Sequence, residues 1–142
     1  MRVEAWIDGA CGPTNPGPYG AWGAVLVAGD VEKRSSGKVD EDRGWTTNQR
    51  AEIAAAIEAL VRVNRPCEVV VFSDSQYLVN TMTRGWARRV NTDLWDRLDR
   101  EIKKHNSVRF KWVRGHHGYP RNEIAHLLAD EVLGAYAFQR PA

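Results

Sequence analysis

The sequence has 142 residues, of which 43% are apolar and 27% charged, and this is the size and composition of one globular domain. We therefore expect a single domain spanning residues 1–142. Its apolar runs are too short to cross a membrane and its N-terminus has no signal-peptide pattern, so a cytoplasmic protein is expected. Cys11 and Cys67 form neither a disulfide framework nor a metal-ligand spacing. A net charge of +2 permits a polyanionic partner without requiring one.

Three strands are predicted in the first part of the chain. Residues 2–7 alternate apolar and polar side chains and are followed by Asp8, so a carboxylate is expected where this strand ends. The glycine- and proline-rich residues 12–18 lack the ending of a nucleotide-binding P-loop, which excludes that kind of site. Further strands are predicted over residues 21–27 and 31–39, and the three should form an antiparallel meander.

A helix is predicted to begin at Thr46, because Gln49 three residues later gives capping-box spacing. Its apolar stripe consists of Ile53, Ile57, Leu60 and Val61. Glu52 lies beside this stripe in the first turns of the helix. We therefore expect the Glu52 carboxylate near the edge of the sheet and not in solvent.

A run of four apolar, β-favouring residues, 69–72, predicts a central strand covered on both faces. Asp74 follows directly, where ligands of open α/β sheets usually bind. A parallel pairing of this strand with the first strand would bring Asp74 beside Asp8. The alternative is that Asp74 only caps the next helix, since aspartate is a favoured N-cap.

The C-terminal part should contain two more helices after Asp74, the second of them capped at residues 91–93, then a strand over residues 108–113 and a last helix opened by Pro120. The core face of the last helix is predicted to comprise Ile124, Leu127, Leu128 and Val132. Its polar face should hold Glu123, His126 and Asp130. The whole order predicts an α/β domain with a five-stranded mixed sheet, made of the antiparallel meander plus two parallel strands, with helices on both faces.

Carboxylates at one sheet edge indicate a divalent-metal site. Two close carboxylates repel each other unless a cation lies between them, and oxygen ligands favour Mg²⁺ or Mn²⁺. Two such ions about 4 Å apart would suit phosphodiester hydrolysis.

At these residues the sequence resembles type 1 ribonuclease H over nearly its full length. The matching segments, in family order, are Asp8–Cys11, Asn15–Pro18 with Gly20, Thr47–Glu52, Ser73–Tyr77, Asn91–Trp95, Trp112–Gly118 and Asn122–Glu123. Each segment alone is a weak signal, but all of them in this order are highly specific.

The resemblance implies a ribonuclease H-like fold and endonucleolytic hydrolysis of the RNA strand of RNA–DNA hybrids, leaving 5′-phosphate and 3′-hydroxyl ends. It implies two Mg²⁺ or Mn²⁺ ions, no small-molecule cofactor, no membrane partner and a monomer. The implied metal ligands are Asp8, Glu52 and Asp74, with His126 at the fourth ligand position, and His116 is the implied proton carrier or aid to product release. His116 and His126 thus join the three carboxylates as the predicted catalytic residues.

The resemblance also implies a substrate surface. Minor-groove contacts, where the 2′-hydroxyls of RNA are displayed, are expected from Asn15, Asn48, Gln49 and Gln76. A DNA-strand phosphate is expected at Thr47 and Asn91. Further substrate contacts are predicted at Gly9, Cys11 and Arg88.

Two departures from the family pattern affect these expectations. His126 stands where the family has a fourth carboxylate, so a tilt from Mg²⁺ toward Mn²⁺ is expected, with the alternative that His126 only hydrogen-bonds a carboxylate or water. Asp130, one turn later, is expected to lie too far along the helix to replace it directly. The segment between Tyr77 and Asn91 is shorter than in members with a basic handle, and Arg88 belongs to its trimmed form.

Three alternative functions follow from the same residues. The first is a hybrid-binding module whose metal site is disabled by His126. The second is a proofreading exonuclease of the same superfold, although Ala10 stands where such enzymes have glutamate two residues after the first aspartate. The third is a plain α/β interaction domain, which leaves the polar residues around Asn48 and Gln76 unexplained.

Overall fold

A computed structural model describes residues 1–39, 41 and 43–139. The elements, in chain order, are β1 (Arg2–Gly12), β2 (Tyr19–Ala28), β3 (Val31–Lys38), α1 (Asn48–Arg62), β4 (Glu68–Ser73), α2 (Gln76–Arg84), α3 (Thr92–Ile102), β5 (Ser107–Trp112) and α4 (Pro120–Gln139). No helix within these residues is long and apolar enough to cross a membrane.

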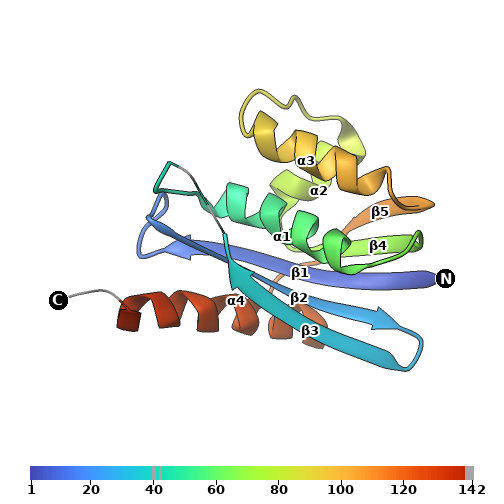
Figure 1. Cartoon of the computed structure of the whole chain (residues 1–142), viewed down its shortest axis with the longest axis horizontal. Coiled ribbons are helices and arrows are strands. Elements are labelled where there is room, and N and C mark those ends of the chain that lie inside the picture. The colour runs from blue at the N-terminus through green and yellow to red at the C-terminus, as the bar shows by residue number, and fades with distance from the viewer. Residues whose placement is uncertain (40, 42, 140–142) are drawn as a thin grey trace.

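One sheet of five strands in the order β3-β2-β1-β4-β5 organises the molecule. β1, β2 and β3 form an antiparallel meander, whereas β4 runs parallel to both β1 and β5. In Figure 1, α1, α2 and α3 lie on one side of the sheet and α4 crosses the other side. The predicted five-stranded mixed sheet with helices on both faces is therefore confirmed.

β1 is longer than predicted, and this extension positions the first carboxylate. Its parallel pairing with β4 stops at Trp6 opposite Phe72, but its antiparallel pairing with β2 continues from Asp8 opposite Gly23 to the end of the strand. Asp8 thus lies within β1, just past the point where β1 and β4 separate. Such a point of separation is where open α/β sheets bind their ligands.

The predicted start of α1 is wrong by one residue. Thr47 is the N-cap, and its Oγ1 accepts a hydrogen bond from the Arg50 backbone N–H at 3.0 Å. Thr46 is instead buried and pairs with Gly17 as a short β-bridge. The backbone of Thr46 is used in that bridge, which leaves the capping position to the next residue.

The predicted core face of α4 is wrong at Leu127, whose exposed fraction is 58%. Ala125 and Ala129 are fully buried instead. A Cβ at Gly23 of β2 would collide with the Ala125 carbonyl oxygen, so helix and strand approach closely. Small residues are needed at that contact, and a leucine is displaced to the outer face.

Candidate active site

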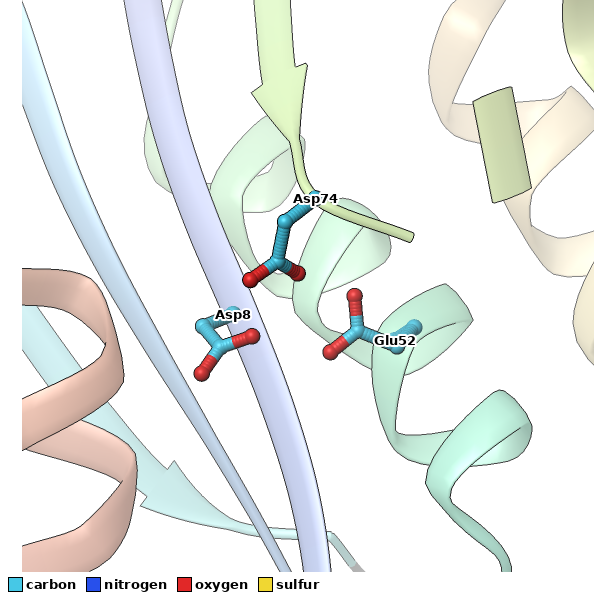
Figure 2. Close-up of side chains that lie close together, drawn as sticks. All are labelled: Asp8, Glu52 and Asp74. Atoms are coloured by element: carbon cyan, nitrogen blue, oxygen red, sulfur yellow. The ribbon is translucent and has the colours of Figure 1, made fainter. Parts of the chain in front are cut away.

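Three carboxylates from three different elements converge at this edge of the sheet. Asp8 comes from β1, Glu52 from α1, and Asp74 follows the end of β4. Each offers an oxygen that lies within 4.8 Å of an oxygen from the other two, and Figure 2 shows the three side chains turned toward a common space. Asp8 and Glu52 are buried and Asp74 is half-buried.

Glu52 is held in place by two donors. The Gly9 backbone N–H donates to Oε1 at 2.6 Å, and the Ser73 hydroxyl donates to Oε2 at 3.3 Å. A Cβ at Gly9 would collide with the Ala51 backbone, so a residue without a side chain lets α1 lie directly against β1. The predicted placement of Glu52 near the sheet edge is confirmed.

Asp74 is not the cap of the following helix. Ser75 is the N-cap of α2, and its Oγ accepts from the Leu78 N–H at 3.1 Å. The Asp74 backbone carbonyl accepts from the Trp112 indole at 3.2 Å, which fixes the chain after β4. The Asp74 side chain is therefore left to face Asp8 and Glu52.

His126 of α4 completes the edge of the cluster. Its Nδ1 lies 2.8 Å from Asp8 Oδ2, and its Nε2 lies 3.1 Å from Asp130 Oδ2. The close packing of α4 on Gly23 brings the imidazole this near to β1. His126 is thus placed beside the carboxylates, as predicted, and is held between two of the molecule's acids.

The electrostatics of the cluster are those of uncompensated negative charge. Burial, followed by the charges of Asp8 and Asp74, raises the pKa of Glu52 well above its usual range. Burial and the Asp8 charge raise the pKa of Asp74 to about 6. Burial alone would lower the pKa of His126, but hydrogen bonding to Asp8 and the charges of Asp8, Asp130 and Asp74 outweigh it and raise it. A divalent cation is the group that would neutralise the three carboxylates, and their oxygen donors fit a hard cation.

The carboxylates line an open cavity of about 380 Å³. The same cavity is lined by Gly9, Ala10, Asn48, Gln49, Ser75, His116 and His126. His116 has a positive φ of 59° in the loop after β5, and its ring lies edge-on to that of His126 with centroids 5.2 Å apart. The predicted histidines and two of the predicted minor-groove residues thus share one cavity with the acids. A second hollow, of about 310 Å³ near Met1 and Cys67, is lined mainly by apolar side chains and has no carboxylate in its lining.

The connection after β1 is tied to the start of α1. The Cys11 backbone N–H donates to Asn48 Oδ1 at 3.0 Å, and the Asn48 N–H donates to Asn15 Oδ1 at 3.1 Å. The Cys11 thiol lies 3.3 Å from the Thr14 carbonyl oxygen. Cys11, Asn15 and Asn48, all predicted substrate contacts, therefore form one network, while Gln76 at the start of α2 is exposed.

Arg50 joins the two residues predicted to hold a DNA phosphate. It is buried, donates to Asn91 Oδ1 at 3.2 Å, and forms ion pairs with Glu41 at 2.6 Å and Asp93 at 2.7 Å. The Thr47 hydroxyl accepts from the Arg50 N–H, which leaves its own O–H to donate elsewhere. Arg50 was not among the predicted site residues, although it belongs to the matching segment Thr47–Glu52.

Arg88, predicted as a substrate contact, has two partners within the fold. Its Nη1 lies 2.6 Å from Asp99 Oδ2, and its guanidinium lies over the Trp95 ring at 5.3 Å. Arg84 and Arg89, also in this segment, are exposed. Arg88 is therefore exposed like its neighbours but is held by an ion pair with Asp99.

The family model for RNase H matches residues 1–133. The chain belongs to the RNase H family. It is 44% identical over 154 residues to the ribonuclease H of Geotalea uraniireducens (strain Rf4), covering 99% of this chain and 100% of that protein. A ribonuclease H from Pseudomonas savastanoi pv. phaseolicola is 45% identical, over 93% of this chain and 95% of that protein.

Solved RNase H structures share this fold. RNase H1 from Halobacterium salinarum NRC-1 superposes with a TM-score of 0.76 at 29% identity, covering 95% of this chain and 99% of that one. LC9-RNase H1, a type 1 RNase H with the type 2 active-site motif, gives 0.77 at 30% identity over 94% of this chain and 72% of that one. As a member of the RNase H family the chain is an endoribonuclease, which decides against the proofreading-exonuclease and interaction-domain alternatives.

Proposed function

We propose that this RNase H hydrolyses the RNA strand of RNA–DNA hybrids internally, with two Mg²⁺ or Mn²⁺ ions, and leaves 5′-phosphate and 3′-hydroxyl ends. The observation that carries the proposal is the convergence of Asp8, Glu52 and Asp74, whose oxygens lie within 4.8 Å of one another. A related fold has been solved as LC11-RNase H1 in complex with RNA/DNA hybrid. We further propose a monomeric, single-domain, cytoplasmic enzyme without a small-molecule cofactor.

The three carboxylates and His126 would hold the metal ions. Two divalent ions held there would supply an activated water and would neutralise charge on the phosphate oxygens. The protein's own contribution is to fix the ligands: Gly9 and Ser73 orient Glu52, and the Trp112 indole fixes the chain at Asp74. Positioning of this kind is worth several kcal/mol of a reaction barrier.

The RNA–DNA hybrid would bind along the cavity and the start of α1. Asn48 and Gln49 line the cavity beside the acids, so their amides can reach the 2′-hydroxyls that distinguish RNA from DNA. Gly9, Cys11, Asn15 and Gln76 are proposed to extend this surface. The Thr47 hydroxyl and Asn91 are proposed to hold a DNA-strand phosphate, with Arg50 fixing both. Arg88 is proposed to position the segment between α2 and α3 through its ion pair with Asp99, and not to contact a phosphate directly.

His116 is proposed to carry a proton or to aid product release. It lies at the rim of the cavity on the loop after β5, within ring contact of His126. An imidazole is suited to this role because its ordinary pKa lies near neutrality.

The test is cleavage of end-labelled RNA–DNA hybrid, double-stranded RNA and duplex DNA in Mg²⁺, Mn²⁺ or chelator. We expect internal cuts in the RNA of the hybrid alone, and none with chelator. Binding of the hybrid without cutting in either metal would instead support the disabled-module alternative. Cutting that persists with chelator would overturn the metal assignment.

A further inference from the structure

Both ring nitrogens of His126 face carboxylates, and this carries an inference about Asp130. Nδ1 lies 2.8 Å from Asp8 Oδ2 and Nε2 lies 3.1 Å from Asp130 Oδ2. A protonated ring can donate to both acids, but a metal ligand must be neutral, and a neutral imidazole has one N–H and donates to only one of them. The other nitrogen then presents a lone pair, and the two possible tautomers have different consequences for metal binding.

The tautomer with hydrogen on Nε2 is the one that can ligate a metal beside Asp8. Adjacent ligands of an octahedral ion with bonds of about 2.1 Å are roughly 3 Å apart, close to the 2.8 Å between Nδ1 and Asp8 Oδ2. With hydrogen on Nδ1, the same space would be filled by an N–H donated to Asp8. Ligation through Nδ1 of His126 therefore requires the hydrogen to be on Nε2.

Asp130 is positioned to accept a hydrogen bond from the Nε2–H of His126. It follows His126 by one helical turn on α4, and among the described residues its ion pair is with His126. It is not part of the cluster of Asp8, Glu52 and Asp74 that could hold an ion. Histidine ligands of metals commonly donate their second N–H to a carboxylate, which fixes ring orientation and strengthens the ligand.

We infer that Asp130 is a positioning residue that accepts the Nε2–H of His126 and so keeps Nδ1 free for a divalent cation. The inference rests on the proposed metal-dependent function and deepens it. Asp130, an exposed residue of α4, would thus hold His126 in the form that can serve as the fourth ligand. Loss of Asp130 should therefore weaken metal binding without removing any ligand.

Calorimetric titration with Mn²⁺ alone tests this on the full chain. Asp130→Ala is expected to weaken Mn²⁺ binding by roughly tenfold. Asp130→Asn keeps an acceptor oxygen at the same place and should retain part of the affinity. The matched control is Glu131→Ala, which removes one negative charge from the next, exposed position of α4 and should change affinity less than about twofold.

Two further measurements separate positioning from simple loss of charge. Nitrogen-15 NMR of the Mg²⁺-loaded parent should show the His126 proton on Nε2, and Asp130→Ala should shift the ring toward a mixture of tautomers. In a His126→Asp background, Asp130→Ala should have no more effect than Glu131→Ala.

Equal affinities for Asp130→Ala and Glu131→Ala, with normal Mn²⁺ binding by the parent, would overturn the inference and leave the proposed function standing. Failure of the parent to bind Mn²⁺ would overturn the proposed metal site itself.

Discussion

Asp74, a proposed metal ligand, occupies a position that lowers the stability of the metal-free fold at neutral pH. Its carboxylate is half-buried beside Asp8 and Glu52, and its pKa is raised to about 6. A raised pKa means that the folded protein holds the proton more tightly than the unfolded chain does. Protonated Asp74 therefore stabilises the metal-free fold relative to the unfolded chain. This stabilisation is full below about pH 4 and is lost as the pH rises through about 6.

Asp74→Asn should therefore abolish cleavage and stabilise the metal-free fold. The amide removes a proposed metal ligand and one of the repelling charges. At pH 7 with chelator, we expect the Tm of the variant to exceed that of the parent by roughly 3–6 °C, and the gain should shrink toward pH 4. Thermal unfolding at several pH values measures this, and near-normal turnover of the variant in Mg²⁺ would contradict the assignment of Asp74.

His126 sets the expected metal preference. A neutral imidazole supplies one negative charge less than a carboxylate, and Mn²⁺ accepts nitrogen ligands more readily than Mg²⁺ does. His126→Asp should lower the Mg²⁺ concentration needed for half-maximal cleavage by roughly tenfold, and His126→Ala should damage activity in both metals. Metal titrations of hybrid cleavage test both variants. Parent-like cleavage by His126→Ala would make His126 a bystander.

Among the secondary-structure elements, glycines set how closely the helices approach the site. A Cβ at Gly9 would collide with the Ala51 backbone, so Gly9→Ala should push α1, and with it Glu52, away from β1. We expect a cost of about 1–3 kcal/mol in unfolding free energy and a sharp loss of cleavage. Denaturant unfolding measures the cost in unfolding free energy, and metal titration of hybrid cleavage measures the loss of activity.

The control for this change lies on α4. A Cβ at Gly134 meets open space, so Gly134→Ala should stabilise the helix by about 1 kcal/mol with unchanged cleavage. Equal effects of the two alanines would show that the close approach at Gly9 does not position Glu52.

In the connection between α2 and α3, Arg88 is expected to stabilise the fold and Arg89 to contact the substrate. Both arginines are exposed, but Arg88 is paired with Asp99 and lies over the Trp95 ring, whereas Arg89 has no ion pair within the described residues. Arg89→Ala should flatten the plot of log hybrid affinity against log salt by about one unit, since a phosphate contact releases counterions. Arg88→Ala should instead lower the Tm with a smaller change in that slope. The reverse pattern would mean that Arg88 leaves Asp99 to bind the backbone.

Hydrophobic periodicity and turn residues were enough to predict the order and type of the elements, because each pattern is local. The positions that sequence patterns missed depend on contacts between elements. Thr47 caps α1 because the Thr46 backbone pairs with Gly17, and Leu127 faces outward because α4 packs closely on Gly23. The sequence predicts only that Asp130 lies too far along the helix to replace the fourth carboxylate, because its contact with His126 becomes visible only when both nitrogens of that ring are placed.

For the molecule as a whole, two charged clusters respond to pH in opposite directions. At the site, the stabilisation that comes from the raised pKa of Asp74 is lost as the pH rises through about 6. The Arg50 cluster ties the start of α1 to the segment before it and to α3, through ion pairs with Glu41 and Asp93. Hydrogen bonding to Arg50 lowers the pKa of Asp93 to about 2, so this cluster stabilises the fold at higher pH. Metal bound at the site would relieve the first cluster and leave the second to govern acid unfolding.

Asp93→Asn should therefore destabilise the protein only where Asp93 is ionised. Its pKa is lowered in the folded state, so its stabilisation is full above about pH 4 and is lost as the pH falls through about 2. We expect a lower Tm than the parent at pH 7 and a difference that closes toward pH 2, measured by thermal unfolding with chelator present. Asp96→Asn is the control, because it makes the same charge change on α3 at an exposed residue with no ion pair among the described residues. A constant difference between Asp93→Asn and the parent from pH 7 to pH 2 would show that the Arg50 pair is not what stabilises the start of α3.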